Sequence, residues 1–470
     1  MCPIVALDPK HLHRPFEGEI AIEAAGTATR CHQIPFCSDI YINQLTLSGK
    51  HDSNFYNYEY RNGCRAVNGV RDRNPDSSRD RLPEPAGMPL VVYLLGLTIF
   101  ALTTSEFMVA GMSPALSAAF AASVAEIGYL VSLYALSMAI GGPLVIALLL
   151  RLKAPNKPAL LLLLGLYVAG GVVAALAPDY GVMAIARIVT GAASSACFGV
   201  ALAIAAELVA PQARGRAASI VLGGLMLAPV LGLPATTAIE QGLGWRASFW
   251  SIAVLAMLST VLVAAFVPDL KSRAEVGISV ELDALRKTRL WAAYTTSGLI
   301  IGATFAAFSY AVPLFIDKAR LSPATMPVLL AAYGGANVFG NLVVGRFADR
   351  YTIPILFGGL IALALALLVF AVFATNSNVA VLAFLAVGVA GVPMNPAMVA
   401  RVMRIAHPGP LVNTVHTSAI TAGLAFGAWA GGVGIDAGYG LTAPLWVGLA
   451  LALLGLLSLA PSRMIDGRIK

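Results

Sequence analysis

The sequence predicts an all-α polytopic membrane protein whose twelve transmembrane helices form two six-helix bundles. Three observations predict this fold class. Of the 470 residues, 58% are hydrophobic and only 12% are charged, which is about half the charged share of an average soluble domain. From Pro89 onward, apolar runs of about 20 residues, long enough to span a bilayer as helices, alternate with short polar gaps. The basic residues are concentrated in every second gap.

The N-terminal segment, residues 1–87, differs from the rest of the chain. It holds ten Lys/Arg and eleven Asp/Glu and has no long apolar run, so it is predicted to be neither a signal peptide nor a membrane span. Low hydrophobicity with balanced charge predicts disorder. An alternative is that translation starts at Met88, directly before the first span. Both interpretations stay open, and neither assigns the segment a function.

The apolar runs define the predicted domains: a first bundle at 88–267, a cytoplasmic linker at 268–289, and a second bundle with its tail at 290–470. Five basic residues in the linker separate the two sets of six spans. The spans are expected at 89–112, 124–150, 157–177, 180–208, 213–239 and 245–267 in the first bundle, and at 290–316, 324–346, 353–374, 377–402, 411–436 and 440–460 in the second.

The distribution of basic residues predicts the orientation. One set of gaps, together with the C-terminal tail, holds 17 Lys/Arg, Arg401 among them, whereas the opposite set holds only Arg246, Lys318 and Arg320. Cytoplasmic loops carry the excess of Lys and Arg, so both termini are predicted to be cytoplasmic. The net charge of +7 is therefore expected to face lipid headgroups. No basic stripe with interleaved aromatic residues suggests nucleic-acid binding.

The sequence offers no sign of a metal site, a cofactor or an enzyme. The five cysteines fit no zinc-binding spacing. No phosphate-binding loop and no nucleophile constellation is present. An energy source other than nucleotide hydrolysis is therefore expected, and ion gradients are the remaining source.

Charged residues inside the predicted spans are the first candidates for function, because each costs roughly 2.5–3.5 kcal/mol at the bilayer centre. Glu106 in the first span and Arg187 in the fourth are expected at similar depth, about 10 Å from the same membrane face. They form either a static ion pair or a proton-coupling pair. Burial and a neighbouring cation act on the proton of Glu106 in opposite senses, so its protonation would respond to small movements. Glu207 and Asp436 lie at span ends, where a structural role is favoured.

Several motifs, in order and on alternating sides, give the chain a family resemblance. They are Thr104-Ser105-Glu106-Phe107 with Gly111 and Pro114, Tyr134-Ala135-Leu136 with Gly141-Gly142-Pro143, Arg187-Ile188-Val189-Thr190-Gly191, the fifth-span stretch from Ala228 to Pro234, the sixth-span entry from Gly244 to Phe249, and the loop from Asn341 to Arg350. Residues 88–470 resemble the major facilitator superfamily. Within it they are similar to the twelve-helix drug/proton antiporters of bacterial inner membranes, the arabinose-efflux-permease-like group.

The resemblance implies roles for the motif residues. The fourth-span arginine, Arg187, is associated with proton coupling in that superfamily. Pro229, Gly232 and Pro234 would bend and thin the fifth span where the two halves meet. In the second-half loop, Gly345 would permit a tight turn, and Arg346, Asp349 and Arg350 would clamp neighbouring helix ends. The equivalent first-half loop, residues 148–154, lacks the usual aspartate, which weakens the expectation of a charge clamp there.

The predicted function is secondary transport of a small molecule, exported in exchange for protons by alternating access of a central cavity. Uptake or facilitated diffusion of a nutrient on the same fold is the alternative, and an enzyme or a sensor is disfavoured. The expected partners are the substrate, protons and membrane lipid, for a monomer in the bacterial inner membrane. Candidate cavity residues are Ser194, Phe305, Phe308, Tyr333, Asn337 and Asn395, with weaker candidates at His416 and Trp429.

Overall fold

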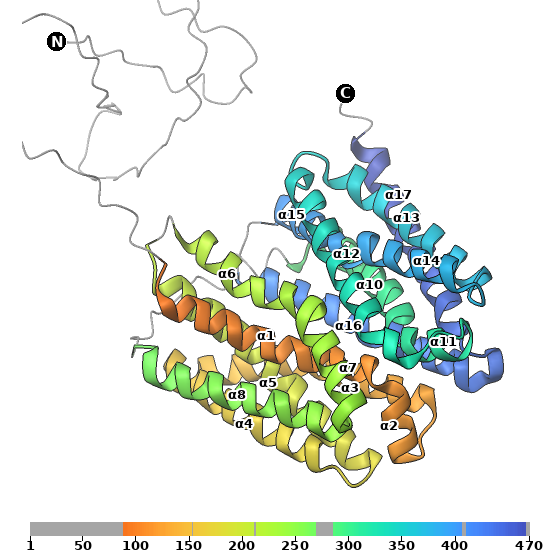
Figure 1. The fold of residues 1–470 in the computed structure, drawn as a ribbon. Coiled ribbons are helices and arrows are strands. Elements are labelled where there is room, and N and C mark those ends of the chain that lie inside the picture. The colour runs from red at the N-terminus through yellow and green to blue at the C-terminus, as the bar shows by residue number, and fades with distance from the viewer. Residues whose placement is uncertain (1–87, 153, 211–212, 269–284, 407–409, 467–470) are drawn as a thin grey trace, which may run out of the picture. The chain divides into compact units, whose positions relative to one another are not determined.

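The computed structural model describes residues 88–152, 154–210, 213–268, 285–406 and 410–466. This part of the chain is helical and contains no strand (Figure 1). The fold class predicted from the sequence is therefore confirmed. The predictions for residues 1–87 and for most of the linker fall outside the described residues.

The first half of the structure comprises α1 to α8 (Figure 1). A short helix between the first two spans, α2, was not predicted. The bounds are α1 Leu90–Gly111, α2 Ser113–Phe120, α3 Val124–Arg151, α4 Asn156–Leu176, α5 Tyr180–Glu207, α6 Arg214–Leu227, the π-helix η3 Ala228–Gly232, α7 Leu233–Leu243 and α8 Trp245–Phe266.

The second half comprises α10 to α17. Its bounds are α10 Thr288–Phe308, α11 Ala311–Asp317, the 3-10 helix η4 Pro323–Thr325, α12 Met326–Phe347, α13 Thr352–Val372, α14 Ser377–Ala390, the 3-10 helix η5 Val392–Met394, α15 Asn395–Ile405, α16 Pro410–Gly434, the π-helix η6 Ile435–Tyr439 and α17 Ala443–Asp466. In Figure 1 these green-to-blue helices lie beside the orange-to-green helices of the first half.

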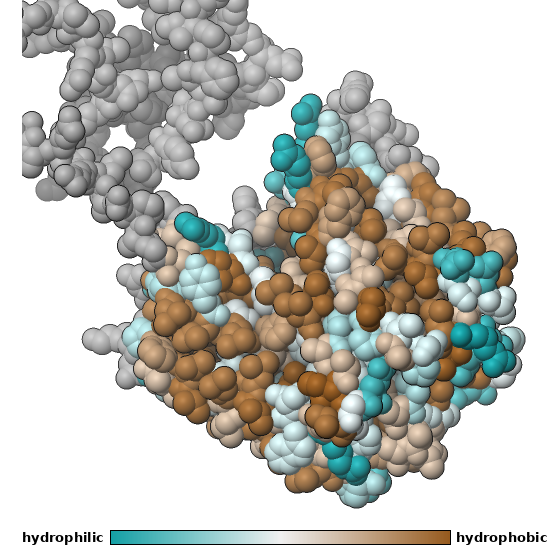
Figure 2. All heavy atoms as spheres, in the orientation of Figure 1, coloured by the Kyte–Doolittle hydropathy of each residue, from teal (hydrophilic) through white to brown (hydrophobic). Residues whose placement is uncertain are grey.

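Eleven helical stretches in the described residues are long and apolar enough to cross a membrane, and Ala443–Leu459 is a shorter apolar helix. Each matches one of the twelve predicted spans. Large apolar side chains cover the outer faces of both halves (Figure 2), as expected when lipid is the solvent. Several spans contain a break with proline in it, such as η3 with Pro229 and η5 with Pro393. Proline has no N–H for the helical ladder, so the local winding changes there.

Each half is held together by contacts among its own helices, and the halves meet along two seams. Within the first half, α5 packs on α3 and α4, and α1 packs on α6 and α8. Within the second half, α10 packs on α16 and α17. The seams between the halves are α3 against α16, and α12 against η3 and α7. Residues Pro85–Lys470 cluster as one compact unit, so the domain limits at 267 and 290 stay a prediction.

Small residues allow the closest helix approach in the second half. A Cβ added to Gly302 would lie 2.8 Å from the carbonyl oxygen of Gly423, and one added to Gly298 would lie 3.0 Å from that of Ala419. The backbones of α10 and α16 are therefore nearly in contact. Without a hydrophobic drive between helices in lipid, such close packing is a main source of their association.

Candidate functional site

The buried charges of α1 and α5 lie side by side in the first half. Arg187 is 1% exposed and Glu106 is 9% exposed. Glu106 is five residues before the end of α1, and Arg187 is seven residues after the start of α5. The residue before helix α5 is Asp179, whose carboxylate accepts a hydrogen bond from the Val182 amide at 2.9 Å, the usual stabilisation of a helix start. The register of α5 places Arg187 on its buried face, toward α1.

The guanidinium of Arg187 is held by the backbone of α1. Its Nη1 donates to the carbonyl oxygen of Ser105 at 2.8 Å, and its Nη2 donates to the carbonyl oxygen of Glu106 at 3.2 Å. On the other side, the ring of Tyr134 stacks on the guanidinium, with the Cζ atom 4.0 Å from the ring centroid. Arg187 and Glu106 are thus neighbours, but the direct ion pair suggested by the sequence is absent among the described residues.

This arrangement leaves the carboxylate of Glu106 chemically available. It forms no hydrogen bond with another described residue, and Nε of Arg187 and the hydroxyl of Tyr167 are buried without a hydrogen-bond partner in the described part. The guanidinium of Arg187 thus donates to backbone carbonyl groups of α1 and not to the carboxylate of Glu106.

Three of the predicted cavity residues form an aromatic cluster, together with one ring from the first half. Phe107 stacks on Phe305 with centroids 5.6 Å apart and meets Phe308 edge-on at 6.0 Å. Phe308 packs on Tyr333 at 5.0 Å, and Tyr333 stacks on Phe384 at 4.5 Å. Phe107, which directly follows Glu106 in the chain, was not among the residues predicted from the sequence. It connects the proton-coupling candidate with the rings of the second half.

The other predicted cavity residues are more dispersed. Asn337 lies one turn after Tyr333 on α12, and Asn395 begins α15. The amide oxygen of each is buried without a hydrogen-bond partner in the described part, so each can still accept a hydrogen bond. Ser194 lies two turns after Arg187 on α5 and is buried. It therefore belongs with the buried charges rather than with the rings.

The fifth-span motif lies where the two halves meet. A Cβ added to Gly334 of α12 would overlap the carbonyl oxygen of Pro229 in η3, and one added to Gly232 would overlap Thr104 of α1. Pro234 is the second residue of α7. The π-helix η3 therefore packs tightly between α1 and α12. Its contact on α1 is Thr104, which lies two residues before Glu106.

We expect Gly334→Ala to weaken this seam, because the added methyl group meets backbone atoms of Pro229 that cannot rotate away. Overpacking of this kind costs about 1–3 kcal/mol, seen as a lower melting temperature in detergent. Gly335→Ala is the matched control, since a Cβ there has no atom within 4 Å. Equal melting temperatures for the two variants would contradict the close contact.

The second-half loop motif corrects one prediction. Gly345 lies inside helix α12 and not in a tight turn, which begins only after Phe347. The guanidinium of Arg404, at the end of α15, donates to the carbonyl oxygen of Asp349, and Arg350 lies over the ring of Tyr351 at 5.3 Å. Arg346 is exposed in the last turn of α12. The clamp on α15 is therefore made by the loop backbone and Arg404.

A second buried polar cluster was not predicted. Arg401, counted from the sequence with the basic residues of a cytoplasmic gap, lies in α15 and is 6% exposed, and its Nη1 donates to Oγ1 of Thr296 at 2.9 Å. Nearby on the α10–α16 contact, Nε2 of His416 lies 2.9 Å from Oγ of Ser297, and its ring stacks on Tyr294. Both contacts of His416 are with residues of α10, so its side chain joins α16 to α10 within the second half. Trp429 is half exposed and packs on Phe426, away from the aromatic cluster.

Comparison with known proteins gives the class and then the family. The Major Facilitator Superfamily model matches residues 95–415. The chain is 32% identical over 370 residues to the inner membrane transport protein YdhP of Escherichia coli K12, covering 78% of this chain and 94% of YdhP. It is 31% identical over 391 residues to a chloramphenicol resistance protein of Streptomyces lividans, covering 80% of this chain and 97% of that protein.

A solved structure of the xylose transporter XylE from E. coli superposes with a TM-score of 0.59 at 17% identity, over 79% of this chain and 95% of XylE. At that identity the similarity concerns the fold. The helices, their order and the family match make the protein a polytopic membrane transporter. The chain belongs to the Major Facilitator Superfamily.

Proposed function

We propose that this transporter exports a small molecule in exchange for protons, with Glu106 as the proton carrier and Arg187 as its fixed counter-charge. The observation that carries the proposal is the unbonded carboxylate of Glu106 beside an arginine anchored to backbone carbonyls. Protonation of Glu106 changes the charge next to Phe107, which packs on Phe305 and Phe308 of the other half. The proton is thereby linked to the contact between the halves.

Hydrogen bonds between the halves support alternating access. Tyr129 of α3 donates to a carboxylate oxygen of Asp436 in η6 at 2.7 Å, and Nε2 of Gln241 in α7 donates to the carbonyl oxygen of Pro323 at 2.6 Å. Both lie at the membrane end opposite the linker. We take this state to be closed at that end, which the excess of basic residues in the other loops makes the outer side. Rocking of the two halves about the central site would open it.

We expect Tyr129→Phe to speed opening of the outer end, because it removes the hydrogen bond to Asp436. A hydrogen bond to a charged group contributes about 1.5–3 kcal/mol, so labelling should become about tenfold faster or more. The measurement is the rate at which a membrane-impermeant maleimide labels Ser113→Cys, a buried position at that end, with the native cysteines replaced by serine. Tyr180→Phe is the control, since Tyr180 bonds the carbonyl oxygen of Glu126 in its own half. Equal labelling rates in the two variants would show that the hydrogen bond between Tyr129 and Asp436 does not hold the outer end closed.

Transport direction is tested in inverted membrane vesicles, whose lumen corresponds to the outside of the cell. Chloramphenicol and xylose are the first probes, chosen from the names of the relative and of the solved structure. A resistance and metabolite-export screen in a strain without its own pumps would extend the panel. An imposed inside-acid gradient should drive an exported compound into the lumen. Depletion of the compound from the lumen would instead support uptake.

A further inference from the structure

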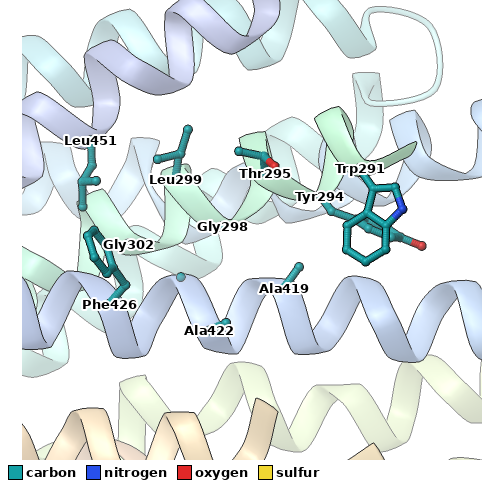
Figure 3. A pocket seen from close by; sticks show the side chains of 11 residues that line it. Trp291, Tyr294, Thr295, Gly298, Leu299, Gly302, Ala419, Ala422, Phe426 and Leu451 are labelled. Atoms are coloured by element: carbon teal, nitrogen blue, oxygen red, sulfur yellow. The ribbon is translucent and has the colours of Figure 1, made fainter. Parts of the chain in front are cut away.

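Polar side chains from three helices surround the guanidinium of Arg187 in the interior of the first half. They are Ser105 of α1, Tyr134 of α3 and Tyr167 of α4, and each is at most 5% exposed. Both tyrosines are electrostatic partners of the guanidinium, and Ser105 and Tyr134 are polar neighbours of the Tyr167 hydroxyl. By contrast, the surface groove along α10 and α16 has an almost wholly apolar lining (Figure 3).

The packing of α4 on α5 places Tyr167 in this interior. A Cβ added to Gly170 would lie 2.8 Å from Cγ2 of Thr190, so the two helices are in close contact there. Tyr167 lies three residues before Gly170 and therefore on the same face of α4. Its ring belongs to the same apolar cluster as Leu102 of α1 and Cys197 of α5. The Tyr167 hydroxyl is thus enclosed by protein.

The hydrogen bonds around Arg187 are incomplete. Among the described residues, Nε of Arg187 and the hydroxyl of Tyr167 are buried without a partner. The contact of Nη1 of Arg187 with Oγ of Ser105 is long, at 3.4 Å. The Tyr134 hydroxyl is also 3.4 Å from its acceptor, the carbonyl oxygen of Leu102, whereas hydrogen bonds to oxygen are usually 2.7–3.2 Å. Protein interiors leave few polar groups unpaired, so two beside two weakly bonded ones require an explanation.

One water molecule is complementary to these groups. The N–H of Nε in Arg187 can only donate, whereas the hydroxyls of Tyr167 and Ser105 can donate or accept. A water can accept from Arg187 and bond to both hydroxyls, which gives the two to four hydrogen bonds that a buried water typically makes. An anion would accept from the same donors, but it would be repelled by the ionised carboxylate of Glu106, another electrostatic partner of Arg187. A neutral occupant fits both protonation states of Glu106.

We propose that a buried water bridges Nε of Arg187 and the hydroxyl of Tyr167, and that Tyr167 acts through it as a positioning residue for proton exchange. The water engages one edge of the guanidinium while its Nη groups donate to the carbonyl oxygens of Ser105 and Glu106. Held at all three nitrogens, the guanidinium is kept from pairing directly with the Glu106 carboxylate. The role in proton exchange rests on the proposed function, whereas the water site does not.

The water is tested by X-ray radiolytic labelling of the wild-type protein in nanodiscs. Hydroxyl radicals formed from a bound water modify the side chains that it contacts, and mass spectrometry locates the modified residue. Tyr310 is the control, because it is also 1% exposed but its hydroxyl donates to the carbonyl oxygen of Ala428 at 2.7 Å. Tyr167 should be labelled clearly faster than Tyr310. Equal rates would overturn the water site.

The positioning role is tested with Tyr167→Phe, by the pH at which a carbodiimide half-modifies the protonated carboxyl group of Glu106. Without the Tyr167 hydroxyl the guanidinium can turn to the carboxylate, and an opposite charge favours the ionised form. The midpoint should move about one pH unit lower, the equivalent of one hydrogen bond to a charged group. Tyr294→Phe should leave it unchanged, since that hydroxyl donates to the carbonyl oxygen of Val412 in the second half.

The alternative is that the Tyr167 hydroxyl is simply unpaired. Tyr167→Phe would then remove only an unsatisfied polar group, so the melting temperature would not fall and the midpoint for Glu106 would not move. That result would overturn the positioning role. A midpoint that depends on chloride, compared with gluconate, would identify an anion and overturn the water.

These outcomes are distinct from a failure of the proposed function. If Glu106→Gln transported normally, Glu106 would not be the proton carrier, yet fast labelling of Tyr167 in that variant would still support the water. Slow labelling of Tyr167 in a protein whose transport is lost in Glu106→Gln would overturn the water and leave the proton carrier in place.

Discussion

We expect Glu106→Gln to abolish proton-driven transport, reducing it to the level of empty vesicles, while the protein still accumulates in the membrane. Glutamine keeps the size of the side chain and removes its ability to bind and release a proton. The anchoring bonds of Arg187 go to carbonyl groups of α1, so the substitution leaves them in place. Transport in inverted vesicles, driven by an imposed inside-acid gradient, is the measurement.

Glu207→Gln is the matched control for this prediction. Glu207 ends α5, and its Oε1 accepts a hydrogen bond from Nδ2 of Asn156 at 2.9 Å, which glutamine can also accept. The control should transport at the wild-type rate. Chemical access gives a second readout, since carbodiimides modify protonated carboxyl groups in apolar sites. Glu106 should be modified more slowly as the pH rises. Wild-type pH dependence of transport in Glu106→Gln would refute the role assigned to this residue.

The second large effect is expected for Arg187→Ala, which should both uncouple transport and destabilise the first half. The substitution removes two hydrogen bonds to the α1 backbone and the stacking on Tyr134. It also empties the volume of a fully buried side chain. Large-to-small substitutions of this kind cost about 2–5 kcal/mol, measured as a lower melting temperature in detergent.

Arg187→Lys separates the two effects. Lysine retains the charge and most of the volume, but its single ammonium group cannot bond two carbonyls in the planar geometry of a guanidinium. We expect it to recover much of the melting temperature and little of the coupled transport. Full transport in Arg187→Lys would mean that a charge at this position is sufficient and that the anchored geometry is not needed.

Much of the fold follows from the sequence because lipid imposes a simple rule. Every backbone polar group in a span must be satisfied within its own helix, so apolar length alone locates each span. The same rule singles out Glu106 and Arg187, because charges are rare in spans. The short helix α2 was missed because eight residues between two spans carry no length signal.

Side-chain partners could not be predicted, since they depend on helix rotation. Arg187 was expected beside Glu106, but the rotation of its helix decides whether it meets the Glu106 carboxylate or the carbonyl groups of α1. Arg401 was counted with the basic residues of a cytoplasmic gap, although it lies within the predicted span 377–402. The structure buries it because Thr296 on α10 offers a polar partner. Gly345 was expected in a turn from the family motif, although it lies within the helix that precedes the turn.

The most direct test of proton exchange is the pH of the vesicle lumen during transport. Inverted vesicles are loaded with an acid-sensing dye, an inside-acid gradient is imposed, and an exported compound from the screen is added. Exchange requires that entry of the compound be accompanied by loss of protons from the lumen, with the dye signal absent in Glu106→Gln. Entry of the compound with no change in lumenal pH, or an unchanged signal in Glu106→Gln, would contradict proton antiport through this carboxylate.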